Sequence, residues 1–85
     1  MTAPRAALRS GADFGRAIAA ARLRRSMTQD ELAVDAGVSR SVLAKIEAGK
    51  STILLDHLLR LIRRLGGTVT VTFDGSTTKD SDGSP

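Results

Sequence analysis

The sequence predicts a mainly α-helical fold in which four short helices precede one β-strand. Three observations predict it. Two helix starts lie within residues 28–49, and a leucine-rich pattern with helical spacing occupies residues 54–65. After Gly66 and Gly67 the apolar period changes from 3.6 to 2, as in a strand. At 85 residues the chain is expected to form one domain with a small core.

The first helix is expected over residues 12–25. Ser10 and Asp13 have the spacing of a capping box at its start. Its apolar stripe comprises Phe14, Ala17, Ile18 and Ala21, continued either by Leu23 or by the aliphatic stem of Arg22. Residues 1–9 show no convincing periodicity, so we interpret them as a basic flexible arm.

The second and third helices are predicted from their termini. Thr28 and Glu31 form a capping box for a helix over residues 29–36, Gly37 supplies the positive φ that ends it, and Ser39 is placed to cap the next helix. Because so few residues join the two helices, they must cross steeply. This is the helix-turn-helix arrangement, whose second helix enters the major groove of DNA.

The fourth helix carries more apolar surface than one small core requires. One face contains Leu55, Leu58, Leu59 and Ile62, and a second contains Leu54, Leu61 and Leu65. We therefore expect the second face to meet another chain.

The strand that follows alternates threonines with Val69, Val71 and Phe73. No other strand is predicted, so its backbone groups need a partner that one chain does not offer. A twofold dimer in which two copies pair antiparallel satisfies them, the alternative being a frayed tail. The expected dimerisation residues are Leu54, Leu61, Leu65, Val69, Val71 and Phe73. Residues 67–74 form this dimerisation strand, and residues 75–85 are polar and expected to be disordered.

Composition points to an acidic partner and away from catalysis. The chain has no cysteine, one histidine and a net charge of +4. Six arginines precede residue 28, opposed there by Asp13 alone, while the last twelve residues are net acidic. This gradient suits a polyanionic partner such as DNA, the alternative being a solvated basic face. No metal, cofactor, catalytic group or membrane span is predicted, and a cytoplasmic location fits the absence of cysteine.

The sequences Thr-Gln-x-Glu-Leu-Ala, Ala-Gly-Val-Ser-Arg-Ser and Ile-Glu-x-Gly-Lys resemble the phage-repressor-like (Cro/XRE) DNA-binding family over residues 14–65. The resemblance implies a four-helix lambda-repressor-like domain, here residues 10–66. The strand after the fourth helix is similar to HipB-type antitoxins, whose dimers are closed by an intermolecular β-ribbon. This second resemblance implies a nucleoid-associated repressor that binds an inverted-repeat operator as a dimer. Such a repressor autoregulates a toxin-antitoxin operon and binds a HipA-like kinase toxin. A stand-alone XRE-family regulator and a pure interaction protein are the alternatives.

The helix-turn-helix interpretation also predicts which residues contact DNA. Base-reading candidates on the third helix are Ser39, Arg40, Ser41, Ala44 and Lys45, of which Arg40, Ser41 and Lys45 match base-contacting positions by resemblance. Phosphate-contacting candidates are Thr28, Gln29, Lys50, Ser51 and Thr52. Taken singly, Thr28 and Ser39 are better explained as helix caps.

Overall fold

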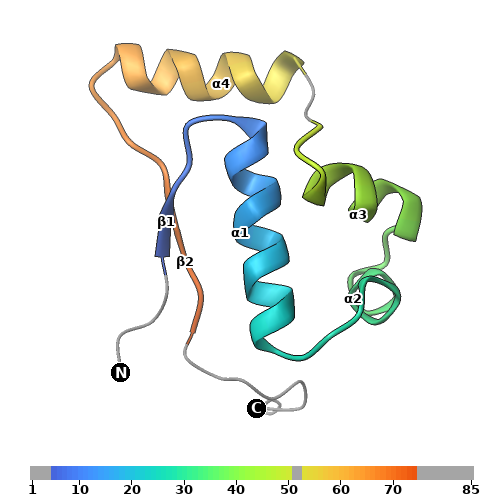
Figure 1. Cartoon of the computed structure of the whole chain (residues 1–85). Coiled ribbons are helices and arrows are strands. Elements are labelled where there is room, and N and C mark those ends of the chain that lie inside the picture. The colour runs from blue at the N-terminus through green and yellow to red at the C-terminus, as the bar shows by residue number, and fades with distance from the viewer. Residues whose placement is uncertain (1–4, 51–52, 75–85) are drawn as a thin grey trace.

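The computed structural model describes residues 5–50 and 53–74. Within that part the elements in chain order are β1 (Arg5–Ala7), α1 (Gly11–Arg24), α2 (Gln29–Ala36), α3 (Arg40–Glu47), α4 (Ile53–Arg64) and β2 (Thr70–Thr72). Figure 1 shows α1 at the centre, with α4 across its N-terminal end, α2 and α3 on one side and the strands on the other. The predicted class, mainly helical with four helices and a short C-terminal strand, is confirmed.

The predicted caps of α2 and α3 are present. Thr28 Oγ1 accepts a hydrogen bond from the Glu31 amide at 3.0 Å, and Glu31 Oε1 accepts one from the Thr28 amide at 2.9 Å. Gly37 ends α2 with φ of 74°, in the left-handed region. Ser39 Oγ then accepts from the Val42 amide at 3.0 Å. These local bonds fix where both helices begin, as the sequence predicts.

The core is small and lies where the helices meet. Its buried apolar side chains are Leu8, Ala17, Met27, Ala33, Leu43 and Leu59. Helix α3 packs against both α1 and α2. At the α1–α3 crossing, a Cβ on Gly15 would lie 2.0 Å from the Ile46 carbonyl oxygen, so only glycine permits this approach.

The expectation that residues 1–9 form a flexible arm is wrong for the described residues 5–9. Arg5–Ala7 is the strand β1, which pairs antiparallel with β2 in the register Arg5↔Thr72, Ala6↔Val71 and Ala7↔Thr70. The Leu8 amide extends this ladder by donating to the Val69 carbonyl at 2.8 Å, and the Leu8 side chain is buried. The partner strand lies far along the chain, so no local periodicity marked this segment. Residues 1–4 lie outside the described part.

This pairing also corrects the idea that β2 lacks a partner within its own chain. Pairs in an antiparallel ladder alternate between hydrogen-bonded and non-hydrogen-bonded. Since Leu8 and Val69 form a hydrogen-bonded pair, the backbone groups of Val71 also face β1. The backbone groups of Thr70 and Thr72 face the opposite edge of β2.

Helix α4 buries a narrower face than predicted. Leu59 is buried and Leu55 and Ile62 are half-buried, but Leu58 is exposed instead of sharing that face. Four leucines with the spacing i, i+4, i+7 and i+11 form an exposed row, which we call the leucine stripe: Leu54, Leu58, Leu61 and Leu65 are 70%, 49%, 59% and 88% exposed. Among the described helices, none is both long and apolar enough to cross a lipid bilayer.

Candidate nucleic-acid interface

The outward face of α3 gathers most of the base-reading candidates. Arg40, Ser41 and Lys45 are exposed, and Ala44 is half-buried beside them. Leu43 is buried on the opposite side and fixes the helix to the core. A short helix held by its inner face and carrying a guanidinium, a hydroxyl and an ammonium group on its outer face has the donors that base edges and phosphates accept.

Two of the candidates are helix caps. The Ser39 hydroxyl caps α3, and the Thr28 hydroxyl belongs to the capping box of α2. Each side-chain oxygen is therefore occupied as an acceptor. Each hydroxyl proton remains available to a phosphate oxygen.

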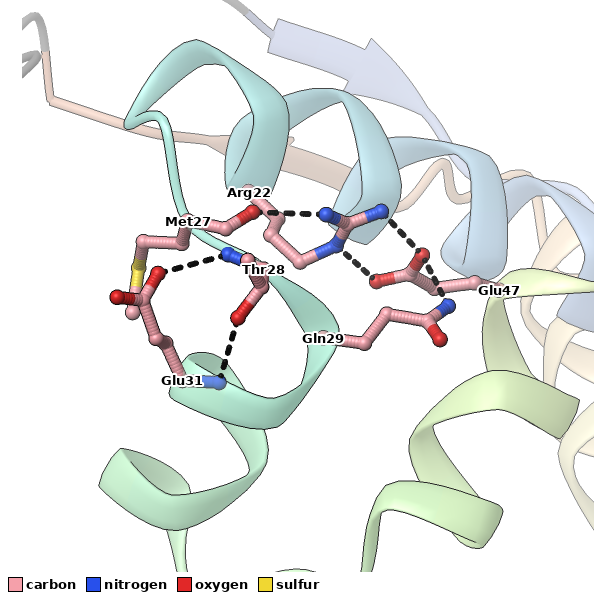
Figure 2. A network of polar contacts seen from close by, with 6 residues as sticks. All are labelled: Arg22, Met27, Thr28, Gln29, Glu31 and Glu47. Atoms are coloured by element: carbon pink, nitrogen blue, oxygen red, sulfur yellow. Dashed lines mark hydrogen bonds and ion pairs between the residues drawn. The ribbon is translucent and has the colours of Figure 1, made fainter.

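Gln29 lies in a network that links three helices (Figure 2). Its Nε2 donates to Glu47 Oε1 at 3.0 Å, while Arg22 donates to both oxygens of the same carboxylate, from Nε at 2.8 Å and from Nη2 at 2.9 Å. Arg22 Nη1 also donates to the Met27 carbonyl at 2.8 Å. The Arg22 and Glu47 side chains are only 12% and 6% exposed. The network therefore fixes the first turn of α2 relative to α1 and α3.

The charges in this network stabilise each other. Hydrogen bonds from the Arg22 guanidinium hold the pKa of Glu47 below its ordinary value, against the burial that raises it, and the Gln29 amide adds to the lowering. The hydrogen bonds to Glu47 likewise raise the pKa of Arg22. Glu47 is thus ionised at neutral pH and bound on both oxygens.

The phosphate-contacting candidates are only partly described. Lys50 is exposed just beyond the end of α3, and its amide donates to the Lys45 carbonyl at 3.0 Å. Ser51 and Thr52 lie outside the described residues. At the start of α2, the amides of Gln29 and Asp30 precede the first intrahelical bond and can donate to an anion.

Sequence reasoning missed the pair Arg22 and Glu47 and the neighbour of Arg40. Of the two continuations proposed for the α1 stripe, the structure selects Arg22, while Leu23 is 64% exposed. Opposite charges at inward positions of two helices were the signal that could have revealed the pair. On the surface, Asp30 Oδ1 of α2 lies 3.2 Å from Arg40 Nε of α3.

The predicted dimerisation residues fall into two groups. Leu54, Leu61 and Leu65 belong to the exposed leucine stripe. Val69, Val71 and Phe73 are half-buried within the chain itself. The described residues contain no cluster of three or more histidine or acidic side chains placed to hold a metal ion.

Comparison with known proteins places this geometry in context. The family model HTH_3, described as helix-turn-helix, matches residues 18–71. The chain is also 31% identical over 72 residues to an uncharacterised HTH-type transcriptional regulator, y4mF, of Sinorhizobium fredii (strain NBRC 101917 / NGR234). That alignment covers 85% of this chain and 95% of the relative. No solved structure matches the chain.

Proposed function

This chain belongs to the helix-turn-helix family HTH_3, and from that premise we propose that it is a transcriptional repressor that binds a specific DNA operator as a homodimer. The exposed outer face of α3 carries the proposal. Arg40, Ser41 and Lys45 lie on this face, and Leu43 is buried on the inner face of the same helix. In the major groove such a helix presents these side chains to base edges. The name of the relative, an HTH-type transcriptional regulator, also supports it.

Each proposed contact has a distinct chemical role. Arg40 and Lys45 are donors suited to guanine, whose O6 and N7 both accept. Ser41 can donate or accept, and Ala44 can touch a thymine methyl group. Lys50, with Ser51 and Thr52 beyond it, would contact flanking phosphates, as would the start of α2 at Thr28 and Gln29. We therefore expect at least one G·C pair in each half-site.

Selection of bound fragments from a pool of random duplexes tests this proposal. The wild type should enrich one inverted repeat. Arg40→Ala should lose discrimination at one base position, worth about 1–3 kcal/mol for a bidentate contact. Lys50→Ala should weaken binding to every sequence similarly and reduce the salt slope by about one unit. Equal wild-type affinity for the enriched and scrambled duplexes would refute specific readout.

The leucine stripe supports the proposed homodimer, which in turn predicts an inverted-repeat operator. A twofold pair presents two α3 helices to half-sites about one DNA turn apart, roughly 34 Å. The four exposed leucines of α4 are a helix face of the kind that pairs with a second helix. The open edge of β2, at Thr70 and Thr72, can extend the same contact by strand pairing.

We further propose that the repressor is the antitoxin of a HipBA-like operon. Support comes from the resemblance to antitoxins in which a strand follows four helices, and the described part of the chain has this order. Co-expression with a kinase-like protein encoded next to it should yield a complex that copurifies through a tag on either partner. If the neighbouring genes encode no such kinase, or the two proteins do not copurify, the chain is a stand-alone regulator.

A further inference from the structure

Asp30 and Arg40 form an ion pair between the first turns of α2 and α3. Asp30 is the second residue of α2 and Arg40 the first of α3, and the Oδ1–Nε distance is 3.2 Å. Their side chains are 74% and 63% exposed. An ion pair this exposed contributes little to the stability of the fold. Its main physical effect is to restrict where the long Arg40 side chain points.

The atoms involved determine which face of Arg40 remains available. Asp30 Oδ1 lies on the Nε side of the guanidinium, a side that Nε shares with one N–H of a terminal nitrogen. The pair of N–H groups at the end of the guanidinium, one from Nη1 and one from Nη2, faces another direction. Two parallel donors at the end of a guanidinium match the two acceptors of guanine, O6 and N7. We propose that Asp30 is a positioning residue that presents the end of Arg40 to guanine and so sets the base preference of α3. This inference rests on the proposed function.

The sign of the electrostatic effect separates this role from general DNA affinity. A carboxylate close to the DNA repels the phosphate backbone of every sequence. Asp30 therefore lowers affinity for all duplexes while it raises discrimination among them. If a residue only stabilised the fold, its substitution would change DNA affinity and discrimination among duplexes in the same direction.

The experiment compares Asp30→Ala with a matched control, Asp35→Ala. Asp35 also lies on α2 and is exposed, and it forms no ion pair within the described residues. Both variants remove one negative charge, so they share any general gain in affinity. Asp30→Glu keeps the charge one methylene further from the backbone and serves as the conservative rescue.

The readout is the ratio of dissociation constants for duplexes with guanine or adenine at the base position that Arg40→Ala identifies. The complete bidentate contact is worth about 5- to 150-fold in this ratio. Loss of its orientation in Asp30→Ala should reduce the ratio by about three- to tenfold, with affinity for random duplex unchanged or higher. Asp30→Glu and Asp35→Ala should keep the ratio within about twofold of the wild type. In an Arg40→Ala background, Asp30→Ala should cause no further loss.

Several outcomes would overturn the proposal. One such outcome is that Asp30→Ala retains the guanine preference, a second is that Asp35→Ala loses it equally, and a third is that Asp30→Ala weakens binding to every sequence equally. If the wild type enriches a motif and any of these results is found, the positioning role fails while the repressor function stands. If the wild type enriches no motif, both fail. Thermal melting of Asp30→Ala and Asp30→Glu by circular dichroism separates a folding defect from a change in readout.

Discussion

Gly15 lies where the backbones of α1 and α3 come closest. A Cβ at this position would meet the Ile46 carbonyl oxygen at 2.0 Å and the Glu47 Cα at 3.3 Å, both backbone atoms that a side-chain rotation cannot move away. By contrast, a Cβ on Gly37 would meet nothing within 4 Å, and the only obstacle there is a φ of 74°. The two glycines are therefore required for different reasons.

Substitution of these glycines by alanine should separate the two reasons. Gly15→Ala forces α1 and α3 apart, and we expect a loss of about 3 kcal/mol, at the upper end of typical overpacking costs. Gly37→Ala should cost about 1–2 kcal/mol, the penalty for a left-handed residue with a Cβ. Denaturant unfolding followed by circular dichroism measures both. A smaller loss in Gly15→Ala than in Gly37→Ala would contradict this description of the helix crossing.

At the scale of elements, α1, α2 and α3 are joined by one carboxylate. Glu47 of α3 accepts hydrogen bonds from Arg22 of α1 and from Gln29 of α2. Loss of the Glu47 charge leaves the Arg22 guanidinium largely buried without its counter-ion. Because Arg22 keeps some contact with water, we expect Glu47→Gln to cost near the lower end of the roughly 3–5 kcal/mol range for such losses.

This carboxylate also predicts how stability depends on pH. The pKa of Glu47 in the folded protein lies below its ordinary value of 4.5, so between those two values the unfolded chain binds more protons. The stabilisation is therefore complete well above pH 4.5 and is lost as pH falls through the folded-state pKa. Thermal melts between pH 7 and pH 3 should show the wild type losing its advantage over Glu47→Gln in this window. An advantage that stays constant across the range would contradict the assignment.

At the scale of the whole molecule, the leucine stripe makes a prediction about assembly. Leu61→Glu puts a charge in the middle of the stripe and should convert the proposed dimer to a monomer, because burial of that carboxylate against a second copy is unfavourable. Leu23→Glu is the matched control, since Leu23 on α1 is 64% exposed and Leu61 is 59% exposed. Light scattering should give a halved mass for Leu61→Glu alone. A wild-type monomer, or a dimer in both variants, would rule out the stripe as the interface.

The proposed dimer predicts that loss of dimerisation also weakens DNA binding. Each chain offers one α3, so a monomer contacts one half-site and loses the gain in effective concentration that a linked second contact provides. Leu61→Glu should thus weaken binding to the full inverted repeat by at least about 100-fold, while its affinity for an isolated half-site stays near that of the wild type. A mobility-shift titration with both duplexes measures the difference.

The sequence by itself determined the features that depend on neighbours within a few residues. The capping box of Thr28 and Glu31, the turn at Gly37 and the cap at Ser39 are local hydrogen-bond and backbone preferences, and each lies where the spacing predicts. The exposure of three leucines on the second face of α4 likewise followed from the helical period. Local rules suffice there because both partners of each contact lie on one helix or turn.

Only the tertiary structure decided which distant segments meet. The β1–β2 pairing joins opposite ends of the described chain, the Arg22–Glu47 pair joins α1 to α3, and Asp30 reaches Arg40 across the turn between two helices. The close approach at Gly15 likewise depends on how α1 crosses α3. These contacts follow from packing geometry, because residues remote in sequence become neighbours only when the helices have settled on a common core.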